Sequence, residues 1–191
     1  MFRRLIGEER GATIVEFALV TIPLTTIMCG LFDLGYRQYV AVQLQDALDQ
    51  AARQVTVGTS TTTAQLNQIV TNKIRPVANN ATVSVVPTSY DTFAHVAKPE
   101  PITTDTAPLG KYNAGDCFLD INGNGVWDAD AGKGGTGGSD DIVVYTATVT
   151  YPAIMPMFGL LGWSKTETVT STAMMKNQPY ASQPQPATIC S

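Results

Sequence analysis

An apolar run from Ala12 to Leu34 constrains this chain more than any other feature of its sequence, because only Glu16 and Asp33 carry charge within it. A helix of that length rises about 34 Å, which is enough to cross the ~30 Å hydrocarbon core of a bilayer. A cleaved secretory signal also combines a basic start with an apolar run. This run is too long for one, has no small-residue cleavage site at its far end and continues into more helix. The sequence therefore predicts an uncleaved transmembrane helix over residues 12–35.

The charges around the span predict its orientation. Three arginines precede it, within a short basic leader over residues 1–11, and no comparable cluster follows it. By the positive-inside rule, the leader stays in the cytoplasm and the chain beyond about residue 36 is exported. We expect a single-pass protein of the bacterial inner membrane whose C-terminal domain is periplasmic or extracellular.

Composition argues against several classes of function. The chain has 15% charged residues, a net charge of −4 and a single histidine, His95. An acidic chain is a poor partner for a phosphate backbone, so no nucleic acid is expected. One histidine in a Thr/Pro-rich segment gives little basis for a metal cluster or a catalytic triad, and no phosphate loop, zinc spacing or nucleophile elbow is present. We expect neither an enzyme nor a small-molecule substrate.

The start of the span carries a carboxylate that needs explanation. Glu16 lies five residues after Gly11, and a charge at the bilayer centre costs about 2.5 to 3.5 kcal/mol. If the peptide bond after Gly11 were cut, the new ammonium of Ala12 would lie one to two helical turns from Glu16 of the same or a neighbouring subunit. The alternative is a glutamate that only reaches back to the cytoplasmic surface.

The segment RGATIVEFALV, followed by an apolar helix, resembles the N-terminus of the TadE/TadG-like family, the minor pseudopilins of the tight-adherence (Flp) type IV pilus system. The resemblance runs from Arg10 to about Val57. Phe17 replaces the tyrosine usual in major Flp pilins, which fits the pseudopilin branch. A second segment, residues 117–152, also looks like parts of some family members.

This resemblance implies a site, partners and a function. A prepilin peptidase would cleave after Gly11, Ala12 would become the mature N-terminus, and Glu16 would serve assembly. The partners would be other pilin-like subunits, the inner-membrane components of the Tad/Flp system and the lipid bilayer. The implied function is pilus biogenesis, with adhesion and biofilm formation as its results.

The helix is predicted to continue past the membrane over residues 36–57. Apolar residues recur there at three- and four-residue steps, and Gly58 ends the run. The stripe predicts a helix that packs on the exported domain, as in a pilin-like lollipop; a short stalk helix is the alternative. Pro23 predicts a kink, and the hydroxyls of Thr21, Thr25 and Thr26 would either bond the freed carbonyl of Leu19 or be ordinary content of the span. The residues of the stripe are Tyr36, Val40, Leu44, Ala47, Leu48, Ala51 and Val55.

The exported domain, residues 58–178, is predicted to be α+β. An amphipathic helix over residues 62–75 precedes strands at 81–86, 142–151 and 166–174, which would form a small antiparallel sheet on that helix. Residues 87–112 are predicted to be a long surface loop, and residues 179–191 a Pro-rich tail. The apolar link 154–163 would either fill the core or form a subunit contact or membrane-facing lip.

An acidic, Gly-rich segment over residues 116–141 contains one candidate ligand loop. Its spacing is that of an EF-hand-like calcium loop with Gly125 at position 6, although position 12 is Ala131 and no helix can follow. Calcium is thus the one cofactor expected, and a pair of Asn-Gly turns in a surface loop is the alternative. Asp140 or Asp141 would also be able to replace the missing carboxylate. The candidate ligands are Asp120, Asn122, Asn124, the carbonyl of Val126, Asp128 and Asp130.

The cysteines agree with export. Cys29 lies in the span, whereas Cys117 and Cys190 lie outside it, where an oxidising compartment favours a disulfide between them. That bond would tie the calcium-like loop to the tail; two free thiols are the alternative. Two functions remain open, a processed pilus assembly component or an unprocessed, single-pass, calcium-binding periplasmic or surface adhesion protein, and an enzyme with a pilin-like anchor is a distant third.

Overall fold

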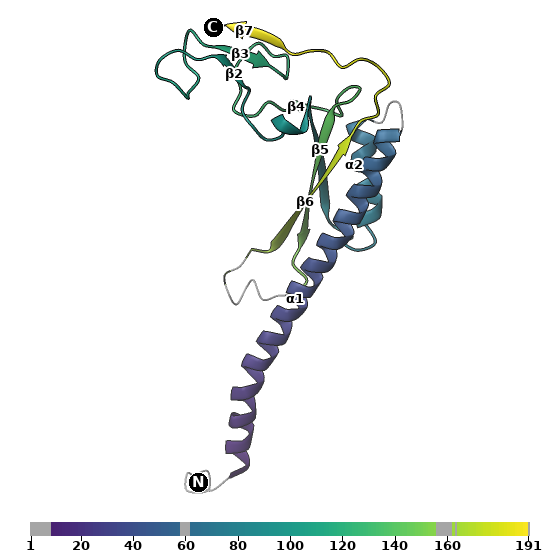
Figure 1. Cartoon of the computed structure of the whole chain (residues 1–191). Helices are drawn as coiled ribbons and strands as arrows, with labels where there is room; N and C mark the ends of the chain where they lie inside the picture. Colours follow the sequence, from purple (N-terminus) through teal and green to yellow (C-terminus); the bar gives the residue numbers. More distant parts are fainter. Residues whose placement is uncertain (1–8, 58–61, 156–161, 163, 191) are drawn as a thin grey trace.

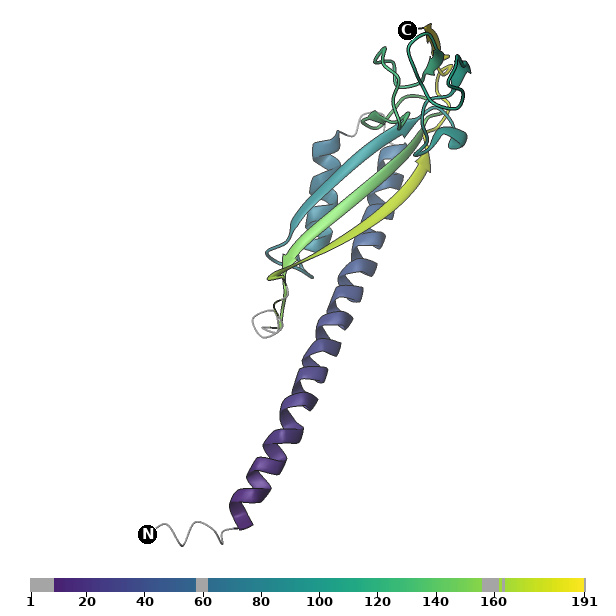
Figure 2. The same ribbon diagram turned by 90° about the vertical axis from the view of Figure 1, so that its left-hand side faces the viewer.

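A single long helix organises the molecule. The structure is a computed structural model that describes residues 9–57, 62–155, 162 and 164–190, and the helix α1 covers Glu9–Val57. Its N-terminal half projects alone, while its C-terminal half packs against a folded head formed with residues 62–190 (Figures 1 and 2). The predicted α+β lollipop is confirmed.

The projecting half of α1 has the character of a membrane span. It is the one helix of the described residues that is long and apolar enough to cross a bilayer, and its most apolar window is not buried by the rest of the protein. Most large apolar side chains of this half are more than half exposed, including Phe17 and Leu19 at 71%. Such a surface is stable in lipid or against other helices, but not in water.

The helix continues through Pro23, and the threonines near it bond differently from the prediction. The hydroxyl of Thr21 donates to the carbonyl of Phe17, and that of Thr26 donates to the carbonyl of Ile22. Thr25 donates to the carbonyls of Thr21 and Ile22. The expected bond to Leu19 is wrong, because a helical hydroxyl reaches a carbonyl three or four residues back along its own face.

The C-terminal half of α1 supplies one wall of the core. Its apolar stripe is buried as predicted, with Val40, Leu44 and Leu48 fully inaccessible. It packs against α2, β5 and β6. The extension is therefore part of the head and not a free stalk.

The second helix, α2 (Thr63–Ile74), lies beside α1 on the same side of the sheet (Figure 2). Thr62 and Gln65 form a capping box that satisfies the free N–H groups at its start. Leu66, Val70 and Ile74 are buried on the face it shares with the core. The predicted helix is confirmed to within one residue at each end.

The main sheet has the strand order β4-β1-β5-β6, and every neighbouring pair is antiparallel. Buried residues alternate along β5 because one face lies on the two helices. The three predicted strands are its three long strands. The bounds of the four are β1 (Thr82–Tyr90), β4 (Lys133–Gly134), β5 (Ile142–Pro152) and β6 (Thr166–Lys176).

β1 runs four residues past its predicted end at Val86. Pro87 lacks an N–H, but its carbonyl accepts from the N–H of Gly135, on the side of the two-residue strand β4. The missing donor therefore faces a sheet edge that pairs only briefly, which is where proline is tolerated in a strand.

A second, smaller sheet was not predicted. Its order is β2-β3-β7, formed by β2 (Ile102–Thr104), β3 (Cys117–Asp120) and β7 (Ala187–Cys190), and it lies at the end of the head farthest from the N-terminus (Figure 1). Residues 87–112 are thus not one loop, since they hold the end of β1, the 3-10 helix η2 (Phe93–His95) and β2. The apolar link 154–163 lies largely outside the described residues.

Candidate functional site

The first candidate site is the start of α1. Gly11 and Ala12 lie within the helix, and Glu16 follows Ala12 by four residues, which is about one helical turn. Glu16 is exposed on a surface of exposed apolar side chains, among them Ile14 and Phe17. Among the described residues it has no ion-pair partner. The geometry thus places a carboxylate where only a partner from outside the head would neutralise it.

The second candidate site is the loop after β3, and a buried glutamate organises it. Glu100 is 1% exposed. Its Oε1 accepts from the N–H groups of Ile121, at 2.8 Å, and Asn122, at 3.4 Å, while Oε2 accepts from Asp128 N–H at 3.2 Å. Its carbonyl accepts from Trp127 Nε1 at 2.9 Å. Three N–H donors from both ends of the loop compensate the desolvation of this carboxylate.

Asp120 holds the inside of the same loop. Its Oδ1 accepts from the N–H groups of Gly123 and Asn124, and its Oδ2 accepts from Gly125. Gly123 and Gly125 both have positive φ, at 75° and 81°, which a side chain rarely adopts. The two Asn-Gly steps therefore form tight turns around one carboxylate.

The remaining candidate ligands contact one another without a metal ion. Asn122 and Asn124 each turn an amide nitrogen toward Asp128 Oδ2, at 2.7 and 2.6 Å. Their amide oxygens accept from backbone N–H groups of the loop, including that of Val126. Among the residues that the structure describes, no group of three or more His, Cys, Asp or Glu is placed to hold a metal ion.

The other acidic candidates lie apart from this cluster. Asp130 accepts from the Tyr90 hydroxyl at 3.3 Å and from Gly132 N–H. Asp140 pairs with Lys176 at 2.8 Å, and Asp141 accepts from Gly138 N–H and Gln183 Nε2. The structure therefore brings together Asp120, Asn122, Asn124 and Asp128, and does not bring Asp130, Asp140 or Asp141 to them.

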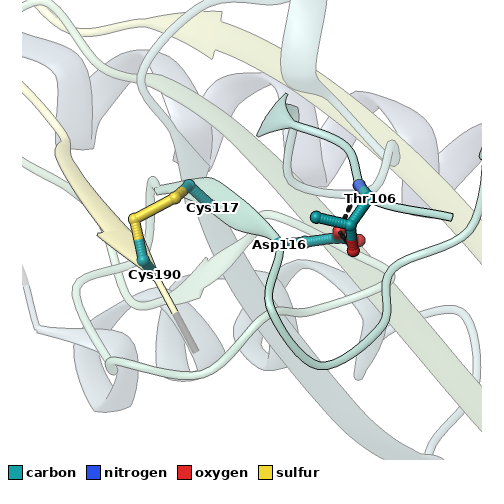
Figure 3. The surroundings of a disulfide bond; sticks show 4 residues. All are labelled: Thr106, Asp116, Cys117 and Cys190. Atoms are coloured by element: carbon teal, nitrogen blue, oxygen red, sulfur yellow. Dashed lines mark hydrogen bonds between the residues drawn. A yellow bond between two sulfur atoms is a disulfide. The ribbon is translucent and has the colours of Figure 1, made fainter.

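The predicted disulfide between Cys117 and Cys190 is present and joins β3 to β7 (Figure 3). Beside it, Asp116 is fully buried and accepts from the N–H and hydroxyl of Thr106, both at 2.7 Å, and from Asn113 N–H. The hydrogen bonds from the hydroxyl and N–H of Thr106 hold the pKa of Asp116 below its ordinary value, against the opposing effect of burial. This carboxylate fixes the loop that leads into β3.

Sequence reasoning missed both Glu100 and Asp116 as organising residues. Glu100 stands between two prolines, and Asp116 is one of six aspartates spread over residues 116–141, so neither has a local pattern that distinguishes it from a solvated surface charge. The role of Glu100 becomes visible only in the fold, where the chain brings residue 100 beside residues 121–128.

Comparison with known proteins finds a similarity within the long helix. Residues 11–53 match the family model described as TadE-like protein. The matched segment begins at the predicted cleavage glycine, covers the span and ends inside the extension of α1 that packs on the head. No curated protein and no solved structure matches the chain.

Proposed function

We propose that this protein is a membrane-anchored minor pseudopilin. The TadE-like match of its N-terminal helix supports a role in Tad pilus assembly. The observation that carries the proposal is the agreement between family match and structure. The matched segment is the part of α1 whose first half is exposed and apolar and whose second half is built into the head. Such a helix anchors the chain and presents a surface to other helices.

Processing is the first step of this proposal. A prepilin peptidase cleaves after Gly11 and leaves Ala12 as the mature N-terminus, with the leader in the cytoplasm and the head outside the inner membrane. The new ammonium lies on the same helical face as Glu16, so it neutralises this carboxylate within the same subunit or in a neighbour.

The role of the protein is then structural. Released from its leader, the exposed apolar half of α1 packs against the helices of other pilin-like subunits and of the inner-membrane assembly components. The head remains outside, where it contacts partners. Adhesion and biofilm formation follow from the pilus that is built.

A complementation experiment tests this function. Cells that lack this protein are supplied with the wild type or with Glu16→Gln, and surface pili are counted by electron microscopy. We expect wild type to restore pili and Glu16→Gln to restore few or none, with equal amounts of protein in the membrane. Asp46→Asn is the matched control, since Asp46 is an exposed carboxylate of the same helix beyond the span. Full piliation by Glu16→Gln would contradict the role of the carboxylate.

Calcium binding is a second candidate, for the loop alone. The observation that favours it is the convergence of Asp120, Asn122, Asn124 and Asp128 on one turn, although both amides would have to turn their oxygens inward. Trp127 lies in the same loop and is a natural sensitiser for terbium luminescence. Terbium emission that calcium displaces and that Asp128→Ala abolishes would support this site, whereas equal emission from Asp128→Ala would exclude it.

A further inference from the structure

The base of the head meets α1 where the span ends. We call the base the turn 75–81, the end of β5 at 152–155 and the start of β6 at 164–167. The Tyr36 hydroxyl donates to the carbonyl of Val77 at 2.8 Å, and its ring lies 5.5 Å from that of Tyr151. Figures 1 and 2 show the base beside the middle of α1, at the end of the head nearest to the projecting half. With the span of the proposed function ending near residue 35, the base would lie at the surface of the bilayer.

The charged side chains at the base, and next to it on α1 and in the last turn of α2, are mostly basic. Arg37 is paired with Glu167 at 3.9 Å. Lys73, Arg75 and Lys165 are exposed, and within the described part of the chain none of the three forms an ion pair. Lys165 is held at the base because its carbonyl accepts from Ala153 N–H at 3.0 Å. Asp33 is the remaining carboxylate at this level.

The opposite end of the head has the opposite charge. Residues 91–141, which include two strands of the small sheet and the loop around Glu100, hold nine carboxylates against three lysines. The charges are therefore separated along the length of the head. An anionic surface attracts its base and repels its far end.

Two exposed side chains beside the basic residues fit an interface between water and lipid. Tyr39 is 51% exposed just beyond the span, and Ile154 is 52% exposed at the end of β5. Tyrosine is enriched at this depth because its ring is amphipathic, and lysine and arginine extend their charged ends to headgroups at the same level.

We propose that the base of the head docks on anionic phospholipid headgroups of the bilayer that α1 spans. Lys73, Arg75 and Lys165 bind the headgroup phosphates, and Tyr39 and Ile154 contact the boundary with the acyl chains. The contact holds the head at a fixed orientation on the membrane before assembly. This inference rests on the membrane anchorage in the proposed function.

Hydrogen exchange of single full-length chains in nanodiscs tests the docking. Discs of phosphatidylcholine alone are compared with discs of equal parts phosphatidylcholine and phosphatidylglycerol. We expect the amides at 77–81 and 153–155 to exchange at least about fivefold more slowly in the anionic discs than in the phosphatidylcholine discs. Amides of β3 serve as the internal reference and should exchange equally in both.

Variants and salt separate lipid binding from other causes. Arg75→Gln/Lys165→Gln should lose the slowing, as should wild type in high salt, whereas Lys111→Gln/Lys133→Gln, with equal charge removed far from the base, should keep it. Equal exchange in both disc types, or slowing that survives in Arg75→Gln/Lys165→Gln, overturns the proposal. If amide exchange at the base slows only in discs that hold several chains, the base contacts a neighbouring copy and not lipid, and the proposal is also overturned. A chain that leaves the discs in a high-salt wash refutes the anchorage itself, which is a distinct result.

Discussion

At the scale of single residues, the core of the head contains a buried hydroxyl that has no hydrogen-bond partner within the described part of the chain. Tyr145 is fully buried in β5, and its hydroxyl has no hydrogen-bond partner among the described residues. Burial raises the pKa of Tyr145 to about 12, because the tyrosinate would lose its hydration. A buried, unpaired hydroxyl costs free energy that a phenyl ring would not.

We therefore predict that Tyr145→Phe leaves the free energy of unfolding unchanged or raises it by about 1 kcal/mol.

The raised pKa of Tyr145 also predicts how the free energy of unfolding depends on alkaline pH. The stability contribution of neutral Tyr145 is complete below pH 10.0 and is lost as the pH rises toward about 12. Denaturant unfolding at neutral and alkaline pH should show a shallower alkaline loss in Tyr145→Phe than in wild type. Tyr180→Phe, at a side chain 74% exposed, is the control and should behave as wild type.

Asp116 has the opposite pH dependence. Its pKa is lowered in the fold by the hydrogen bonds from Thr106, so the stability it contributes is present above its ordinary value of 3.8 and is lost as the pH falls below it. Asp116→Asn should be less stable than wild type at neutral pH and should lose less stability on acidification. Denaturant unfolding across this range measures both effects. If the unfolding free energies of the two proteins fell in parallel as the pH is lowered, Asp116 would not account for the loss of stability in acid.

At the scale of elements, the stability of the small sheet depends on the disulfide more than that of the main sheet does. β7 pairs with β3 over four residues, and the disulfide closes a loop with a sequence separation of 73 residues. By the loop-entropy model such a closure stabilises the fold by about 4 kcal/mol, and measured values are typically 2 to 4 kcal/mol. The main sheet, with two pairs of long strands on a buried core, has no such dependence.

Replacement of both cysteines by serine should therefore act locally. In Cys117→Ser/Cys190→Ser we expect a loss of about 2 to 4 kcal/mol in unfolding free energy and faster hydrogen exchange in β7. Amides of β5 should keep their protection. Cys29→Ser removes the free cysteine of α1 and is the matched control. Faster exchange throughout β5 would show that the two sheets unfold as one unit.

The sequence was sufficient to predict the elements that have long periodic patterns. The stripe from Tyr36 to Val55, the helix α2 and the three long strands all repeat over ten residues or so, and each was placed to within a few residues. The small sheet was missed because its strands have three or four residues, and β7 lies in a Pro-rich tail. The role of Glu100 was missed because burial by a distant segment leaves no local signal.

At the scale of the whole molecule, one continuous helix joins the exposed apolar segment to the head. α1 is continuous from Glu9 to Val57, and its buried stripe fixes it to the sheet. The hydrogen bond from Tyr36 to Val77 and the pairing of Arg37 with Glu167 add contacts at the junction. The C-terminal half of α1 is therefore part of the head, and the exposed half continues the same helix.

Processing after Gly11 is the claim on which the account of this helix depends most. The most direct measurement is the intact mass of the membrane-extracted protein, from cells with a competent prepilin peptidase, for wild type and for Gly11→Ala. We predict a wild-type chain that begins at Ala12, and a Gly11→Ala chain that keeps its leader because the peptidase requires an unobstructed backbone at the cut. A wild-type chain that still begins at Met1 would contradict the account and favour an unprocessed, membrane-anchored protein.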